Sequence, residues 1–184
     1  MEHDQLDIIY ILDAPRWSES WVKAMETAEP VVFVASPAFW AQKYAECEKN
    51  GTVKWRTKTV GQEEISVRQI TLDQILQEPF FLTEKHANYR QALDQHLASC
   101  RCCLSPVLEI SDTAFIIQML EQSRGLSFLP LFAVQKQIWE GTLAAVEVDD
   151  VEISMYRQIF YHKNKFRTRE MEQFIIFASE EENH

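Results

Sequence analysis

Hydrophobic and polar positions along this chain follow two different spacings. Short, nearly continuous apolar runs are typical of buried strands and occur at 6–12, 30–36, 79–83, 106–111, 126–131, 143–149 and 157–163. Between these runs, apolar residues recur three and four positions apart, which predicts helices over 17–27, 38–48, 72–77, 89–98, 112–122, 132–139 and 168–178. This alternation is typical of parallel sheets with helices on both faces, so the pattern predicts an α/β fold.

Two stretches interrupt the alternation. Residues 48–66 are polar, contain an Asn-Gly pair and mix Val and Thr with charged residues, which predicts a surface loop or a hairpin insertion. Residues 179–184, "SEEENH", have the composition of a disordered tail.

Helix ends are marked by residues with known capping roles. Thr71 and Gln74 have the spacing of a capping box, and Gly141 is typical of a helix stop before a strand. The segment "SDTAFIIQML" opens with three residues whose side-chain oxygens cap helices. Periodicity alone favours a helix that merely packs on a sheet. The alternative is that its free N–H groups face a ligand.

Composition narrows the class of protein. A chain of 184 residues, 46% hydrophobic and 25% charged, fits one globular domain or one domain split into two lobes. The net charge of −10 argues against binding to nucleic acid or to an anionic membrane surface. No apolar run approaches the roughly 20 residues that span a bilayer, and the start has no basic segment of a signal peptide. These features predict a cytoplasmic protein.

The four cysteines are Cys47, Cys100, Cys102 and Cys103, and the last three lie within "SCRCCL". This cluster suggests a metal or redox site, but no second pair lies at zinc-finger spacing and no histidine is suitably placed. Reduced, partly buried thiols are the favoured interpretation, with redox sensing as a weaker alternative. We therefore predict no metal site and no cofactor.

Motifs of catalysis are not found. The chain has four glycines and no phosphate-binding loop, no nucleophile elbow and no H-E-x-x-H. The five histidines are scattered, and His162 is interpreted as a surface residue. The sequence thus predicts a protein that is not an enzyme and has no catalytic residues.

Polar side chains instead gather where predicted strands give way to helices. Ser36 ends one apolar run, Thr83, Glu84 and Lys85 follow another, and residues 111–113 follow a third. Ligands of open α/β sheets bind at the carboxyl ends of strands, where helix N-termini converge. This arrangement predicts a site for a small polar or anionic ligand without catalysis.

The same segments resemble, in order, the effector-binding domain of LysR-type transcriptional regulators. "QLDIIYIL" is similar to the Asp-containing strand of the first lobe, and "EPVVFVASP" to the strand that crosses to the second. "ITLDQILQEPFFLTEKHANYRQAL" resembles the entry into the second lobe, and "LEISDTAFIIQMLEQSRGLSFLPLFAV" its helix–turn–strand. "EGTLAAVEV" and "RQIFYHKNKF" match the closing strands. The resemblance covers residues 5–178, and its ordered series is more specific than any single motif.

This resemblance implies two Rossmann-like lobes joined by crossing strands, as in type 2 periplasmic binding proteins, with a small effector between them. Lobe I would comprise 1–34 and 151–184, and lobe II 35–150. Thr83 and Thr113 have an alternative role as caps of their own helices. By position, the residues that would line the cleft are Leu12, Asp13, Ser36, Thr83, Glu84, Ser111, Asp112 and Thr113.

Two departures from the family modify this expectation. Ser123 stands where the family usually has a glycine before the strand. The chain also starts after the family's winged helix-turn-helix and the first strand–helix–strand of lobe I, so that lobe is expected to be incomplete. DNA would then be contacted only through a domain outside this chain. The missing strand would expose a sheet edge, which predicts a homodimer or higher oligomer and weak effector binding.

Three functions follow from the sequence. The favoured one is the effector-binding domain of a LysR-family regulator that binds a small, anionic metabolite. A stand-alone solute-binding protein of the same fold is the alternative, although the start of the chain does not resemble a secretion signal. A small enzyme with an unrecognised site is the third.

Overall fold

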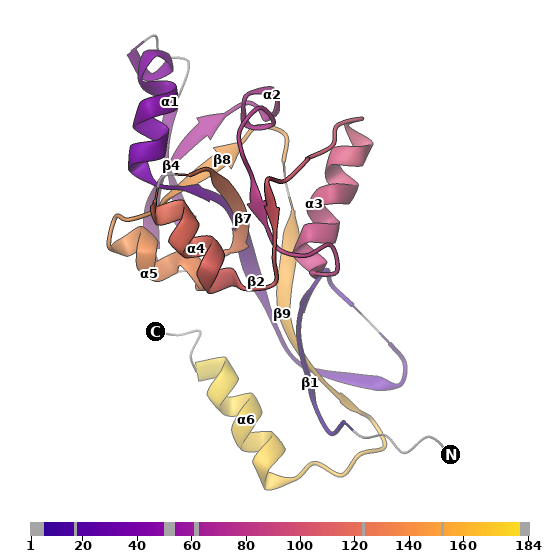
Figure 1. Cartoon of the computed structure of the whole chain (residues 1–184). Coiled ribbons are helices and arrows are strands. Elements are labelled where there is room, and N and C mark those ends of the chain that lie inside the picture. Colours follow the sequence, from indigo (N-terminus) through magenta and orange to yellow (C-terminus); the bar gives the residue numbers. More distant parts are fainter. Residues whose placement is uncertain are drawn as a thin grey trace. The chain divides into compact units, whose positions relative to one another are not determined.

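The computed structural model of the chain describes residues 6–16, 18–49, 54–60, 63–122, 124–151 and 153–180 (Figure 1). The chain separates into two compact units. Unit 1 comprises Met1–Glu29 and Ser154–His184, and unit 2 comprises Pro30–Ile153. The long strand β2 (Trp21–Ala35) contributes residues to both units.

Unit 1 is built on the strand β9 (Ser154–His162), which has a neighbour on each side. The strand β1 (Ile9–Asp13) pairs with it antiparallel, from Ile9 opposite Phe160 to Asp13 opposite Tyr156. The strand β2 is its other neighbour, and the helix α6 (Arg169–Glu180) completes the unit. The tail predicted at 179–184 is wrong at its first two residues, which end α6, and residues 181–184 lie outside the described residues.

The helix predicted over 17–27 is wrong for the described residues, because 18–20 lead through a turn into β2, which begins at Trp21. Met25 and Glu29 are buried whereas Glu26 and Ala28 are exposed, which is the alternation of a strand. Ala, Met and Glu favour a helix locally, but β2 pairs with β9, and the Arg157 guanidinium lies 2.8 Å from the Glu29 carboxylate. Pairing across the sheet overrides the local preference.

Unit 2 holds a mixed sheet. The strand β2 is flanked by β7 (Leu126–Pro130) and β8 (Ala144–Val148), both antiparallel to it. Beyond β8 lie β4 (Glu63–Ile70), which is parallel to β8, and β3 (Lys54–Val60). A separate parallel pair consists of β5 (Phe81–Leu82) and β6 (Leu108–Glu109). The α/β class is confirmed, but the expectation of parallel strand pairs is wrong for most of the sheet.

The irregular stretch at 48–66 has a definite place in this sheet. The helix α1 (Pro37–Lys49) reaches into it, and β3 and β4 form an antiparallel hairpin with Val60 opposite Glu63. The hairpin was one of the two predicted alternatives. It is not a mere insertion, however, because β4 pairs with β8 and extends the main sheet.

Helices cover both faces of the unit 2 sheet (Figure 1). On one face, Phe33 of β2 packs with residues of α1, α2 (Leu72–Ile75) and α3 (Asn88–Ser99). On the other, Val34 packs with residues of α4 (Thr113–Glu121) and α5 (Leu131–Trp139). Consecutive residues of a strand point to opposite faces, so β2 forms the centre of both apolar clusters.

Helix ends follow the predicted signals. Thr71 and Gln74 form the expected capping box at α2, and Gly141 follows α5 with a φ of +73°. Ser123 lies outside the described residues. Within the described part of the chain, no helix combines the length and apolar character needed to cross a bilayer.

Candidate effector-binding site

Two strand-to-helix turns of unit 2 lie next to each other because β5 and β6 are paired in parallel. Phe81 is opposite Leu108 and Leu82 opposite Glu109, so both strands end at the same edge. Thr83 follows β5 and precedes α3, while Ser111 and Asp112 follow β6 and precede α4. The pairing therefore brings together residues that are almost 30 positions apart in the sequence.

Three hydroxyl groups converge at this edge. Burial raises the pKa of Tyr89 above its ordinary value of 10.0, the side chains of Thr83 and Thr113 lower it in part, and the negative charge of Glu84 raises it again. The pKa of Tyr89 thus responds to both threonines and to Glu84, which indicates that these side chains are neighbours. The cluster thus unites three of the predicted site residues around a fourth residue, Tyr89.

The hydroxyl of Thr83 is the least satisfied member of this cluster. Thr83 is 4% exposed, and its Oγ1 has no hydrogen-bond partner among the described residues. The Thr83 side chain nevertheless lowers the pKa of Tyr89 in part, which indicates that the two groups are close. Thr83 does not cap α3, because the capping position is Ala87, which makes no side-chain capping bond. A buried hydroxyl without a partner is rare in proteins and suits a position that a ligand satisfies.

The start of α4 is capped by only one of its three polar residues. Asp112 Oδ1 accepts a hydrogen bond of 3.1 Å from the backbone N–H of Phe115. Ser111 is exposed, and Thr113 is the first residue of the helix. The carboxylate of Asp112 stabilises the positive end of the helix dipole, and its charge also opposes the binding of an anion there.

The side chain of Arg90 connects α3 to the ends of both strands. Its side chain is almost fully buried, and its Nη1 donates to the backbone oxygen of Thr83 at 3.0 Å and to Glu109 Oε2 at 3.5 Å. Its Nε donates to both carboxylate oxygens of Asp94 at 3.0 Å. One guanidinium thereby joins α3 to the ends of β5 and β6, which fixes the position of Thr83.

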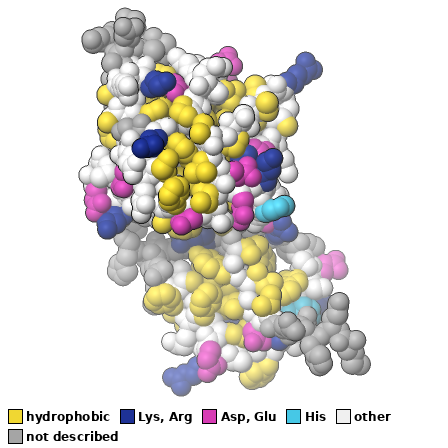
Figure 2. All heavy atoms as spheres, viewed as in Figure 1, with side chains coloured by type: hydrophobic (Ala, Val, Ile, Leu, Met, Phe, Trp, Pro, Cys, Tyr) yellow, Lys and Arg dark blue, Asp and Glu magenta, His cyan; other side chains and the backbone are white. Residues whose placement is uncertain are grey.

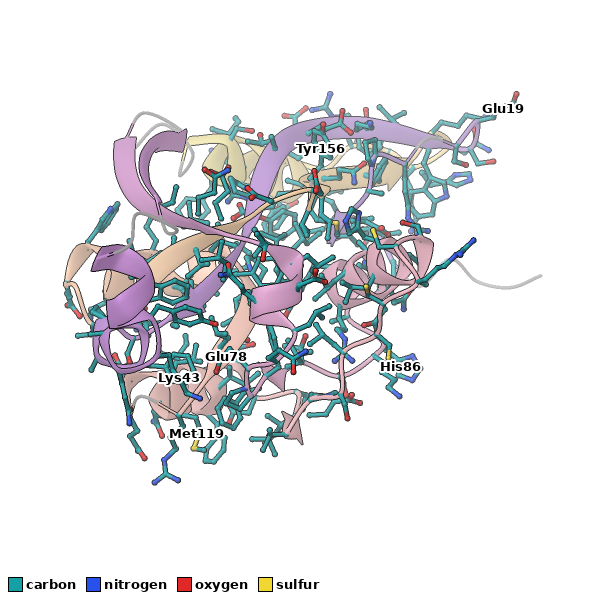
Figure 3. All side chains as sticks on the ribbon, turned by 90° about the horizontal axis from the view of Figure 1, so that it is seen from above. Glu19, Lys43, Glu78, His86, Met119 and Tyr156 are labelled. Carbon is teal, nitrogen blue, oxygen red and sulfur yellow. The ribbon has the colours of Figure 1, made fainter. Side chains whose placement is uncertain are left out.

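The polar side chains around the turn are exposed. Glu84, Lys85 and His86 are all exposed, and Figure 3 shows His86 at the outer margin, directed away from the ribbon. Glu84, one of the predicted site residues, thus raises the pKa of Tyr89 through its charge from an exposed position.

The remaining predicted residue of unit 2, Ser36, has a structural role. It is buried at the junction of β2 and α1, where its Oγ accepts a hydrogen bond of 3.1 Å from Phe39 N–H. Proline follows it at the first position of α1, as is common at helix starts. Ser36 therefore caps α1.

Leu12 and Asp13 belong to unit 1. Leu12 is half-buried in β1, opposite Arg157. Asp13 is buried; its Oδ1 accepts from the Ala14 N–H at 2.8 Å, and its carboxylate pairs with Arg16. The amide of Gln158, itself fully buried, donates to the backbone oxygen of Ala14 at 3.0 Å and accepts from Arg16 N–H at 3.0 Å. The turn after β1 is thus held rigidly by β9, and the Asp13 side chain serves this turn.

A small cavity of about 60 Å³ also exists in unit 2, away from the hydroxyl cluster. It is lined mainly by apolar residues of β2, β7 and β8, among them Val31, Phe33, Phe128 and Val146. Binding sites for small molecules have volumes of roughly 300–1,000 Å³, so this cavity is too small for an effector. Among the residues that the structure describes, no three His, Cys, Asp or Glu side chains come together as metal ligands.

The fold defines a class of protein. Two α/β units that share a long strand, with polar residues at the strand-to-helix turns, are the architecture of type 2 periplasmic-binding-protein-like effector domains. Residues 63–182, more than half of the chain, match the LysR substrate binding domain, and the chain belongs to this family.

Individual relatives agree with this assignment. The chain is 24% identical over 119 residues to the HTH-type transcriptional activator CmpR of Synechocystis sp.; the match spans 64% of this chain and 39% of that protein's length. The CcmR regulatory domain of Synechocystis PCC6803 in complex with 2-PG has a TM-score of 0.64 at 14% identity, over 95% of this chain and 72% of that one. The effector-binding domain of QuiR in complex with shikimate has a TM-score of 0.65 at 10% identity, over 98% of this chain and 73% of that one. At these identities the solved structures establish the fold alone.

Proposed function

We propose that this chain is the ligand-sensing domain of a LysR-family transcriptional regulator and binds a small anionic metabolite at the edge formed by β5 and β6. The observation that carries this proposal is the buried Thr83 hydroxyl without a hydrogen-bond partner among the described residues, at the edge where β5 and β6 bring the starts of α3 and α4 together. Hydroxyl groups and backbone N–H groups at helix starts are the donors that carboxylate and phosphate oxygens require.

The charges at this edge narrow the chemistry of the ligand. Glu84 and Asp112 are both exposed carboxylates close to the cluster, and they repel a simple anion. A ligand that carries hydroxyl groups besides its acid group donates hydrogen bonds to these carboxylates, which compensates the repulsion. Hydroxylated acids are therefore the best candidates. The ligands named with the similar CcmR and QuiR domains, 2-PG and shikimate, are likewise small molecules.

In the proposed regulator, this chain is the sensing domain and a different domain contacts DNA. The net charge of −10 leaves the contact with DNA to a separate domain of the regulator. The chain acts in the cytoplasm as a sensor and not as an enzyme, and it works as a dimer or higher oligomer. The similarity to a transcriptional activator supports the regulatory, non-catalytic role.

A thermal-shift screen tests the binding site. The panel contains hydroxylated carboxylates, simple carboxylates, amino acids, phosphate and sulfate, and the neutral amides of the acids that bind. A ligand at 100 times its Kd stabilises the folded state by about 2.7 kcal/mol, which raises the Tm of a domain of this size by roughly 5–10 °C.

Three variants and one control make this screen specific. Thr83→Ala, Tyr89→Phe and Thr113→Ala are each expected to abolish most of the ligand-induced shift. The control Thr142→Ala should retain the ligand-induced shift, because the Thr142 hydroxyl donates to Glu121 at 3.0 Å, outside the cluster. Equal shifts with the neutral amides would contradict an anionic ligand, and an undiminished shift in all three variants would place the site elsewhere.

A further inference from the structure

The C-terminal end of α3 carries a turn with an unusual set of side chains. Cys100 is the capping residue, and Arg101 has a left-handed φ of +59°. The N–H of Arg101 donates to Ala98 O at 3.0 Å, and that of Cys102 donates to Leu97 O at 2.8 Å. This pair of bonds is the Schellman arrangement, in which the left-handed position is usually glycine. Here the position is occupied by an arginine, for which this conformation is sterically unfavourable.

The three cysteines of this turn differ in their surroundings. Cys102 is half-buried against the apolar cluster of α1 and α3, and its Sγ donates to Cys100 O at 3.5 Å. Cys100 and Cys103 are exposed, and all three are free thiols. The expectation of partly buried thiols therefore holds for Cys102 and is wrong for Cys100 and Cys103. The side chain of Cys47 lies outside the described residues.

A histidine stands next to one of the exposed thiols. His96 precedes Cys100 by one helical turn, and its Nε2 lies 3.9 Å from the Sγ of Cys100. The Oγ of Ser99 lies 3.8 Å from the same sulfur. The expectation that no histidine is suitably placed concerns a metal site, whereas His96 here contacts a single thiol. Carbonyl groups at the end of a helix do not stabilise a thiolate, so a neighbouring group that accepts the thiol proton matters at this position.

We propose that this turn is a site of oxidation by peroxides, with Cys100 as the attacking thiol and Cys103 as the resolving thiol. The spacing of these two cysteines is C-x-x-C, which is typical of reversible dithiol chemistry. His96 accepts the proton of Cys100, and Cys102 anchors the turn to the core. A metal site is not favoured, because no metal-binding group of three ligands is found among the described residues.

The proposed reaction has two steps. The Cys100 thiolate attacks one oxygen of hydrogen peroxide; an S–O bond forms, the O–O bond breaks, and hydroxide leaves and takes up the proton held by His96 to give water. The Cys103 thiol then attacks the sulfenic sulfur of Cys100, which forms the disulfide and releases a second water. Two thiols are oxidised, one peroxide is reduced, and a dithiol reductant reverses the reaction.

Peptide mapping tests this proposal directly, because Arg101 separates the two cysteines. The reduced chain is treated with hydrogen peroxide, blocked with an alkylating reagent, denatured and digested with trypsin. Cleavage after Arg90, Arg101 and Arg124 places Cys100 in peptide 91–101 and Cys103 in peptide 102–124. The expected result is a reducible species that joins these two peptides, with two free thiols lost per chain.

Matched variants identify the participants. Cys103→Ser should abolish the linked species, whereas Cys102→Ser and Cys47→Ser should retain it. His96→Gln should slow its formation about tenfold or more without preventing it. Linkage that persists in Cys103→Ser, a bond confined to peptide 102–124, or linked dimers on a non-reducing gel would each overturn the proposal. Circular dichroism verifies that every variant is folded.

Discussion

Gly125 and Gly141 differ in what surrounds their α-carbons. A Cβ at Gly125 would overlap the backbone oxygen of Pro79 and lie 2.8 Å from the ring of Phe81. At Gly141 no atom lies within 4 Å of such a Cβ, but φ is +73°. The first glycine is required by the close approach of β7 to the start of β5, and the second by the backbone conformation after α5.

Alanine substitutions distinguish these two reasons. Gly125→Ala is expected to lower the free energy of unfolding by about 3 kcal/mol or more, because backbone atoms must move. Gly141→Ala should lower it by about 1 kcal/mol, the cost of a left-handed alanine. Urea denaturation of both variants measures the difference, and equal losses would contradict this account.

Tyr89 makes the stability of the protein depend on pH in the alkaline range. Because burial raises its pKa above 10.0, the folded state holds this proton more tightly than the unfolded state does. The contribution of the protonated Tyr89 to the free energy of unfolding is present below pH 10, and it is lost as the pH rises through the folded-state pKa. Between about pH 9 and pH 11, wild type should therefore lose stability more steeply than Tyr89→Phe. Parallel curves in urea titrations at several pH values would show that Tyr89 is not perturbed.

Among the helices, α4 combines a structural and a functional demand at its first turn. Asp112 caps the helix through Phe115 N–H, yet its charge opposes an anionic ligand. Asparagine caps as well as aspartate does but is neutral. Asp112→Asn should therefore leave the stability within about 0.5 kcal/mol of wild type and increase the affinity for an anionic ligand.

Two further variants control this prediction. Asp112→Ala should lower the free energy of unfolding by about 1 kcal/mol, because the cap is lost. Ser111→Ala, at an exposed position beside the cap, should change stability by less than about 0.5 kcal/mol. Thermal denaturation with and without the ligand separates the two effects of Asp112. Weaker binding in Asp112→Asn would indicate that the carboxylate itself contacts the ligand.

Each unit of the whole molecule carries exposed apolar side chains. In unit 1, Phe177 is 60% exposed on α6, and Tyr10 of β1 packs edge-on against Phe174 at 6.2 Å between ring centres. Within the described residues, β9 is the only strand paired with β1. In unit 2, Figure 2 shows apolar side chains gathered over α4, where Phe115 is exposed. An apolar helix face beside an open sheet edge favours association through unit 1.

Sedimentation velocity tests this association. Wild type at tens of micromolar should sediment as a dimer or larger species, and Phe177→Glu should shift it toward the monomer. Val107→Glu, which changes an exposed residue of unit 2, should leave the distribution unchanged. A clean monomer for wild type would refute the expectation.

The family was recognisable from the order of short segments, and the comparison over residues 63–182 confirms it. The site was predicted only in part. Thr83 and Thr113 stood out because hydroxyl residues followed apolar runs, but Tyr89 gave no comparable signal, since a tyrosine in the first turn of a helix is unremarkable by itself. Its position became meaningful once the turns before α3 and α4 were adjacent.

The sequence by itself determined features that depend on residues a few positions apart. The capping box of Thr71 and Gln74 and the strand–helix order from β5 to α6 are of this kind, because capping and periodicity act within one or two helical turns. The tertiary structure decided what depends on distant partners. Residues from Trp21 form a strand because β9 is paired with them, and the hydroxyls meet because β5 and β6 are adjacent. Sheet pairing joins residues far apart in the chain, so local preference does not determine it.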